Sequence, residues 1–104
     1  MIDNDVKLTD LYKKIELYRK INHDVLQEIH FQDKKWGVQN HDFPTWAVIL
    51  GEEFGEACQE ILNLRILDTT ETVNVLKNLD NELVQIIAVA MRIVEKIRTL
   101  NVNS

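Results

Sequence analysis

Residues 83–94 read LVQIIAVAMRIV, a stretch in which Gln85 and Arg92 are the only polar residues. At about 3.6 residues per turn, this composition makes a helix that is apolar around nearly its whole circumference. Such a helix needs more than one neighbour to cover it. The stretch therefore predicts an all-α protein in which this helix is central.

Two more helices are predicted before it. Apolar side chains recur at three- and four-residue steps near the start of the chain, the pattern of one helical stripe: Leu8, Leu11, Tyr12, Ile15, Tyr18, Ile21, Val25, Leu26 and Ile29. Residues 34–46, KKWGVQNHDFPTW, break this period and predict a loop. We expect the second helix to run from about Thr45 to Leu67, with either Asp42 or Thr45 as its N-cap.

The third helix has a start signal of its own. Asp68 and Glu71 have the spacing of a capping box, and the apolar pattern ends near Leu100. The chain has 104 residues, of which 45% are hydrophobic, with three Gly and one Pro. This composition is typical of one compact helical domain, which we expect to span residues 1–104.

Charge and cysteine content narrow the classes of protein and partner. The net charge of −5 disfavours a nucleic-acid partner, which needs clustered Lys and Arg. A single cysteine, Cys58, cannot form an internal disulfide. The first ten residues, MIDNDVKLTD, lack the apolar core of a signal peptide, and no apolar run is long enough for a membrane span. We therefore expect a cytoplasmic protein with no membrane partner.

The amount of apolar helix surface predicts self-association. Three helices of one subunit cannot bury both the second helix and the nearly all-apolar third helix. Unburied stripes of this size would be costly exposed patches, which favours a homodimer or homotetramer with a core of the four-helix-bundle type. The alternative is a monomeric three-helix bundle with an apolar surface.

Acidic side chains gather on one side of the second helix. At about 100° per residue, four glutamates fall within one sector of about 100°: Glu52, Glu53, Glu56 and Glu60. One interpretation is a solvated face. Against it, glutamates four residues apart repel one another, and no Lys or Arg lies between Gln39 and Arg65.

A further glutamate on the third helix suggests a metal site. Glu82 lies at the edge of the apolar run, and antiparallel helices would bring it close to Glu53 and Glu56. Massed carboxylates at low dielectric need protonation or a cation, and oxygen ligands suit Mg²⁺ or Mn²⁺. The Glu-x-x-His pattern of di-iron bundles does not occur, which disfavours ferritin-like redox chemistry.

GEEFGEACQEIL, residues 51–62, followed by NELVQIIAVAMRIVE, residues 81–95, resembles the MazG-like all-α nucleoside triphosphate pyrophosphohydrolases. The hallmark of that family is EExxE, a spacer and ExxD. Glu52, Glu53 and Glu56 match the first part and Glu82 opens the second, but Gln85 replaces the aspartate. The stretch QDKKWGVQNHDFPTW, residues 32–46, also resembles small phage- and prophage-type members, so the resemblance covers roughly residues 25–95.

The resemblance implies hydrolysis of a nucleoside triphosphate to its monophosphate and pyrophosphate, as in nucleotide-pool house-cleaning. Mg²⁺ would be held by Glu53, Glu56 and Glu82, and by Gln85 through a neutral carbonyl oxygen. Glu52 is the candidate for positioning or deprotonating the attacking water. Because Gln85 removes one negative charge, either the activity is retained or the chain is a weakened relative.

Four residues are candidates for the substrate side: Lys34, Lys35, Trp36 and His41. Lysine suits phosphate oxygens, a tryptophan face can stack on a base, and histidine can donate hydrogen bonds. Each has a plainer alternative, namely a solvated helix end for the lysines, a core anchor for Trp36 as for Trp46, and a structural role for His41. For Arg92 and Lys96 we favour a surface role over contact with phosphate.

Two other classes of function stay open. One is a non-catalytic helical oligomer that binds nucleotide or metal, which Gln85 favours. The other is an interaction module whose glutamates dock a basic partner.

Overall fold

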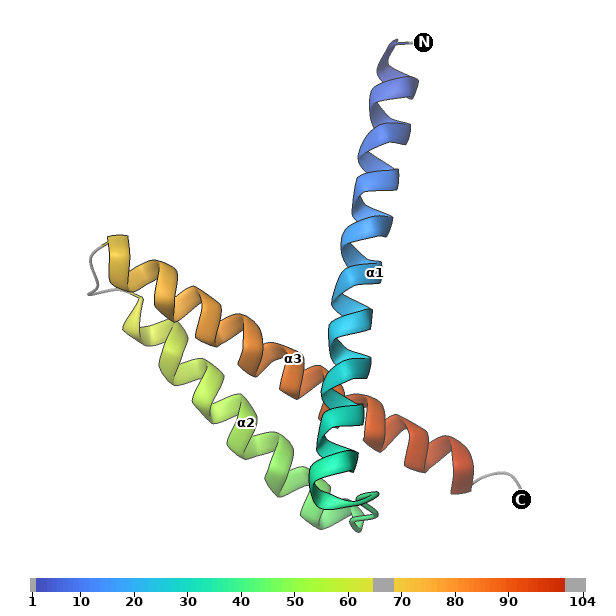
Figure 1. Ribbon diagram of the computed structural model, residues 1–104, viewed down its shortest axis with the longest axis vertical. Helices are drawn as coiled ribbons and strands as arrows, with labels where there is room; N and C mark the ends of the chain where they lie inside the picture. Colours follow the sequence, from blue (N-terminus) through green and yellow to red (C-terminus); the bar gives the residue numbers. More distant parts are fainter. Residues whose placement is uncertain (1, 65–68, 101–104) are drawn as a thin grey trace.

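The computed structural model describes residues 2–64 and 69–100, and all of the regular structure in these ranges is helical. The elements are α1 (Ile2–Trp36), α2 (Phe43–Asn63) and α3 (Thr69–Leu100). α2 and α3 lie side by side as an antiparallel hairpin, and the second half of α1 crosses α3 (Figure 1). The predicted all-α class with three main helices is confirmed.

α1 ends later than the sequence pattern predicts. Its last turn contains Lys34 and Lys35, and it continues to Trp36, so the prediction that these three residues belong to a loop is wrong. Gly37 follows with a φ of +79°, a left-handed conformation that glycine adopts without steric cost and that commonly ends a helix. The glycine, rather than the loss of the apolar period, sets the end of α1.

α2 begins at Phe43, two residues before the predicted start. Of the two possible caps, Asp42 is the N-cap, because its carboxylate accepts a hydrogen bond from the backbone N–H of Thr45 at 2.9 Å. This bond lowers the pKa of Asp42. α2 ends at Asn63 rather than at Leu67. Residues 65–68, including Asp68 of the predicted capping box, lie outside the described residues.

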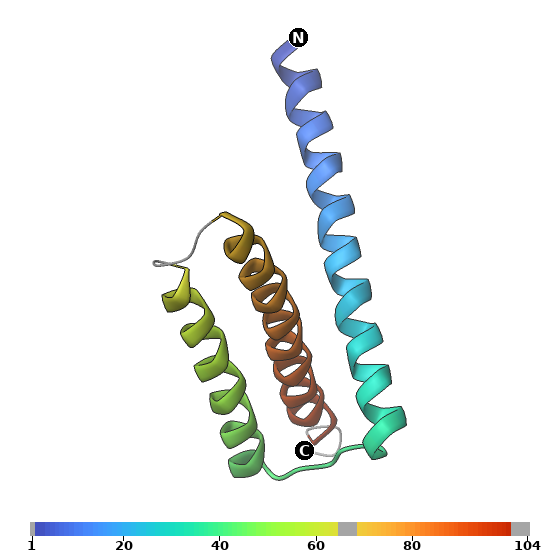
Figure 2. The same ribbon diagram turned by 60° about the vertical axis from the view of Figure 1, so that its left-hand side comes forward.

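The core lies where α3 packs against the other two helices, which do not pack directly against each other. Figure 2 shows α3 between α2 and the lower part of α1. The buried apolar side chains of the described residues are Val25, Trp46, Ala57, Leu79, Ala88 and Val89. Many large apolar side chains of all three helices are exposed, among them Phe54, Ile61, Leu83 and Val94.

None of the helices in the described part of the chain combines the length and the apolar character that a membrane crossing requires.

Candidate functional site

Two glutamates of the α2–α3 hairpin each bury one carboxylate oxygen. Oε2 of Glu53 on α2 and Oε2 of Glu82 on α3 are shielded from solvent. Neither oxygen accepts a hydrogen bond from any residue that the structure describes. A buried carboxylate oxygen without a donor is costly, so these two atoms are the part of the hairpin that most needs a proton or a cation.

The electrostatics of Glu53 follow from this burial. Loss of hydration raises the pKa of Glu53, and the neighbouring carboxylates of Glu56, Glu82, Glu28 and Glu52 raise it further, in that order. Residues of all three helices therefore act on one carboxyl group.

Glu82 has the same kind of environment from the side of α3. Burial raises its pKa first, and the carboxylates of Glu56 and Glu60 add to the effect. Because Glu56 acts on both Glu53 and Glu82, the three predicted metal ligands form one electrostatic cluster.

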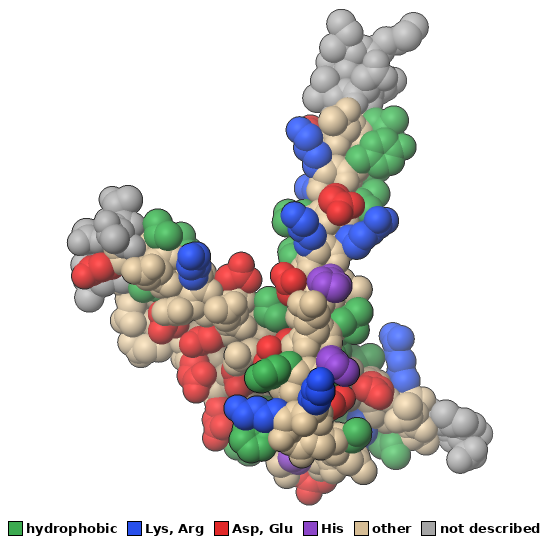
Figure 3. All heavy atoms as spheres, viewed as in Figure 1, with side chains coloured by type: hydrophobic (Ala, Val, Ile, Leu, Met, Phe, Trp, Pro, Cys, Tyr) green, Lys and Arg blue, Asp and Glu red, His purple; other side chains and the backbone are tan. Residues whose placement is uncertain are grey.

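The other glutamates of the predicted strip differ in burial. Glu52 and Glu56 are exposed, whereas Glu60 is half-buried. Figure 3 shows acidic side chains gathered along the hairpin. In the ranges 2–64 and 69–100, no group of three or more His, Cys, Asp or Glu side chains is arranged to hold a metal ion. The predicted ligand set of Glu53, Glu56, Glu82 and Gln85 therefore stays a prediction.

A cavity of about 310 Å³ joins this cluster to the end of α1. Glu53 of α2 and Gln85 of α3 line it, together with Lys35 and Trp36 of α1. The remaining lining residues are Glu28, Phe31, Gln32, Gln39, Trp46, Ile49 and Val89. Residues predicted for the metal side and the substrate side thus meet in one cavity.

Lys35 and Trp36 present a cation and an aromatic face at this cavity. The Lys35 Nζ lies 4.9 Å from the centre of the Trp36 ring and 5.9 Å from that of Phe31. Trp36 is 66% exposed, so it is not a core anchor. Lys34 is exposed on the same turn and does not line this cavity.

His41 and Trp46 have a structural arrangement. Trp46 is 3% exposed and is a core anchor, as one of the two interpretations predicted. His41 packs edge-on against it, with ring centres 4.8 Å apart and planes at 81°. His41 does not line the cavity that contains Trp36. Of the four predicted substrate residues, Lys35 and Trp36 line this cavity, whereas His41 packs on Trp46.

The sequence pattern missed one acidic residue of the site. Glu28 on α1 lines the cavity with Glu53 and Gln85, and Gln32 donates a hydrogen bond to its Oε1 at 2.9 Å. Glu28 precedes the recognised motif, and only the packing of α1 on α3 brings it near Glu53. Its position four residues before Gln32 was a local signal of a paired side chain.

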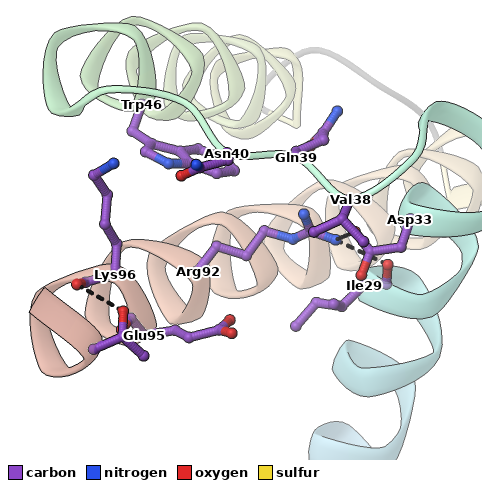
Figure 4. Close-up of a pocket in the computed structure, with 10 residues that line it drawn as sticks. Ile29, Asp33, Val38, Gln39, Asn40, Trp46, Arg92, Glu95 and Lys96 are labelled. Atoms are coloured by element: carbon purple, nitrogen blue, oxygen red, sulfur yellow. Dashed lines mark hydrogen bonds and ion pairs between the residues drawn. The ribbon is translucent and has the colours of Figure 1, made fainter.

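The predicted surface role of Arg92 is wrong. Arg92 is 6% exposed, and its guanidinium donates to the Asp33 carboxylate at 2.6 Å and to the Ile29 carbonyl at 2.9 Å (Figure 4). Asp33 was available as a partner only because α1 crosses α3 at this point. Lys96 lies one turn further along α3, with its Nζ 5.2 Å from the centre of the Phe43 ring.

The donors at the hairpin fit a hard divalent cation. Carboxylate and amide oxygens are the ligands that Mg²⁺ prefers, and the two unpartnered oxygens of Glu53 and Glu82 are of this kind.

Comparison of the chain with models of known protein families, with characterised proteins and with solved structures gave no match in any of the three.

Proposed function

We propose that this chain is a Mg²⁺-dependent nucleoside triphosphate pyrophosphohydrolase of the MazG-like kind. The observation that supports the proposal is the cavity that Lys35 and Trp36 line together with Glu53 and Gln85. A nucleoside triphosphate combines an anionic chain with a flat base, and this cavity offers a place for a cation, a lysine and an aromatic face.

Glu53, Glu56 and Glu82 are the proposed holders of Mg²⁺, or of Mn²⁺, with Gln85 as a neutral oxygen donor. When bound, the cation supplies neutralisation of the triphosphate and a lowered pKa for water. Burial first, and then the neighbouring carboxylates, raise the pKa values of Glu53 and Glu82, and a cation bound beside both carboxylates would offset these two costs of ionisation, which supports the assignment. Glu28, which the motif does not include, adds a carboxylate where Gln85 lacks one.

The other residues bind and orient the substrate. Lys35 is positioned to donate hydrogen bonds to phosphate oxygens, and the exposed face of Trp36 is suited to stack on the base. Glu52 is exposed beside Glu53 and is the candidate to accept the proton of the attacking water. The products would be a nucleoside monophosphate and pyrophosphate, which fits house-cleaning of the nucleotide pool in the cytoplasm.

Self-association belongs to the same proposal. α3 carries a row of exposed apolar side chains, and a second copy of the chain that covers them would complete a four-helix core. They are Val73, Leu76, Leu83, Ile87, Met91 and Val94. The state proposed is a homodimer or homotetramer.

Pyrophosphate release from a panel of ribo- and deoxyribonucleoside triphosphates with Mg²⁺ tests the activity. Wild-type protein should release pyrophosphate together with the monophosphate, and Glu53→Gln should abolish the release. Glu16→Gln, an exposed change on α1 outside the cavity, should leave it intact. If no nucleotide gives pyrophosphate at high protein concentration, with Mn²⁺ also tried, the proposed pyrophosphohydrolase activity is refuted.

One observation favours a second candidate, a non-catalytic protein that binds nucleotide or metal. Gln85 lines the cavity where a further carboxylate is expected. In that case nucleotide and Mg²⁺ should raise the melting temperature of the protein without product formation. Gln85→Asp would then be the change most suited to create hydrolysis.

A further inference from the structure

The first half of α1 forms an arm that stands away from the rest of the molecule. The arm comprises residues 7–22 of this helix. The views in Figures 1 and 2 both show the arm clear of α2 and α3. Every arm side chain is exposed except that of Ile21, which is half-buried. Within residues 2–64 and 69–100, no other helix therefore covers the apolar side chains of the arm.

Those side chains have the spacing of a coiled coil. Leu8, Leu11, Ile15 and Tyr18 follow one another at steps of three and four residues, which is the heptad pattern of a and d positions. The four side chains are between 44% and 62% exposed. A stripe with this period predicts a helix running alongside the arm.

The same stripe is already covered at its other end. It continues through Asn22 to Val25, which is 1% exposed because α3 packs on this part of α1. α3 then diverges from the arm (Figure 1). The face that packs on α3 at Val25 therefore continues for two heptads without a covering helix from the described residues, so a helix of a second molecule is the candidate to cover it.

We propose that the arm pairs with the arm of a second copy of this chain as an antiparallel two-stranded coiled coil. Leu8 lies opposite Tyr18 of the second copy, and Leu11 lies opposite Ile15 of the second copy. The pairing is self-complementary, since the same four residues on each arm form all four layers, as a two-fold axis requires.

Steric occupancy selects the antiparallel orientation. A parallel partner in register would continue along the stripe to Val25, a place that α3 of the same chain occupies. In the antiparallel register the partner helix ends close to Asn22, where the packing of α3 begins. The arm then has one neighbour along its whole length and no position has two.

Charge favours the same orientation. In a parallel coiled coil Lys14 at a g position would face Arg19 of the second copy at an e position, twice per dimer. The antiparallel pair brings only the two Lys14 side chains near each other. Like charges at these flanking positions disfavour a pairing, so the parallel form carries the larger penalty.

This inference is independent of the proposed hydrolase activity. Antiparallel arms hold the two α2–α3 hairpins at opposite ends of the coiled coil. The exposed apolar face of each hairpin stays available for a second interface, and two two-fold interfaces whose axes cross at right angles combine into a tetramer.

Sedimentation equilibrium on the full chain tests the pairing. Ile15→Asp places a carboxylate in two of the four layers, and we expect the apparent dissociation constant of the arm interface to rise at least 100-fold, which halves the mass of the assembly. Leu17→Asp is the matched control, because Leu17 is 55% exposed on the same helix but off the stripe. A monomeric wild type, or an Ile15→Asp protein with wild-type mass, would overturn the proposal.

Disulfide trapping tests the orientation, on a Cys58→Ser background. Leu8→Cys mixed with Tyr18→Cys should form a disulfide between the two different chains. Leu8→Cys alone should stay reduced, because an antiparallel pair separates the two positions by about 15 Å along the axis at 1.5 Å per residue. Efficient self-coupling of Leu8→Cys, or no coupling in the mixture, would overturn the antiparallel pair.

Discussion

Arg92 and Asp33 form an ion pair 2.6 Å long that joins the buried face of α3 to the last turns of α1. The same guanidinium nitrogen donates to the carbonyl of Ile29 at 2.9 Å. Lys35 and Trp36 follow Asp33 within one turn, and both line the cavity that contains Glu53 and Gln85. The ion pair therefore holds the segment of α1 that completes the candidate site.

Removal of either partner of this ion pair should destabilise the fold by different amounts. Asp33→Asn leaves the charge of Arg92 buried and without a counter-ion, which should cost about 3 kcal/mol. Arg92→Met should cost less, about 1 kcal/mol, because the Asp33 side chain is 33% exposed and can be hydrated. Urea unfolding at one fixed protein concentration measures both changes.

A surface pair provides the control for these two variants. Arg19 and Glu16 are both largely exposed and lie 3.8 Å apart, so Glu16→Gln should change the free energy of unfolding by less than about 0.5 kcal/mol. The expected order is Asp33→Asn, then Arg92→Met, then Glu16→Gln. An Arg92→Met protein that is less stable than Asp33→Asn would contradict the assignment of the buried charge to Arg92.

The fold class could be predicted because the signals that decide it are local. The apolar run of residues 83–94, the stripe of α1 and the cap at Asp42 each involve neighbours within a few turns. Arg92 could not be placed in this way, since Asp33 is 59 residues away in the chain. The sequence shows only a cation in an apolar run, and its burial depends on where α1 crosses α3.

The residues of the candidate site also differ in whether the sequence could predict them. Glu53 and Glu82 lie on adjacent antiparallel helices, so their common electrostatic environment could be anticipated from spacing. Glu28 could not, because it comes from a third helix. The different burial of Trp36 and Trp46 also needed the structure, since composition does not show which tryptophan lies in the core.

The stability of the protein should depend on pH because of the glutamate cluster. Burial and like charges raise the pKa of Glu53 above its ordinary value of 4.5. Between 4.5 and the raised pKa the folded state binds more protons than the unfolded state, so without divalent cations stability should fall as pH rises through that window. Melting temperatures measured in EDTA from pH 4 to pH 8 check this.

Glu53→Gln isolates the contribution of that carboxyl group. Without metal, the variant should be more stable than wild type above the window and similar to it below pH 4, where both side chains are neutral. Mg²⁺ should reverse the order at pH 7, since a cation at 100 times its dissociation constant adds about 2.7 kcal/mol to the wild type. A wild-type curve that coincides with that of Glu53→Gln in both conditions would exclude a role for the carboxyl group.

Glu28 and Gln85 should compensate for each other in cation binding, because both line the cavity beside Glu53. Glu28→Gln removes a charge and should weaken Mg²⁺ binding about tenfold, in the range seen for residues that support metal ligands. Gln85→Asp should strengthen binding, and by a larger factor in the Glu28→Gln protein than in the wild type, because the added carboxylate then meets less repulsion from Glu28. Calorimetric titration with Mg²⁺ measures all four proteins, and the same factor for Gln85→Asp in both backgrounds would mean that the two residues do not share a site.

Substitution of Trp46 and substitution of Trp36 should have different effects. Trp46 is buried, so Trp46→Ala should cost about 3–5 kcal/mol of stability. Trp36 is exposed at the cavity, so Trp36→Ala should change stability by less than about 0.5 kcal/mol.

If Trp36 stacks on the base, its loss removes about 1–3 kcal/mol of binding, which should raise the KM for the nucleotide by roughly 5- to 150-fold. Initial rates measure the KM, and quenching of Trp36 fluorescence by nucleotide in a Trp46→Phe protein measures stacking without turnover. Unchanged fluorescence at saturating nucleotide, together with an unchanged KM in Trp36→Ala, would remove Trp36 from the substrate site and leave Lys35 as its only candidate on α1.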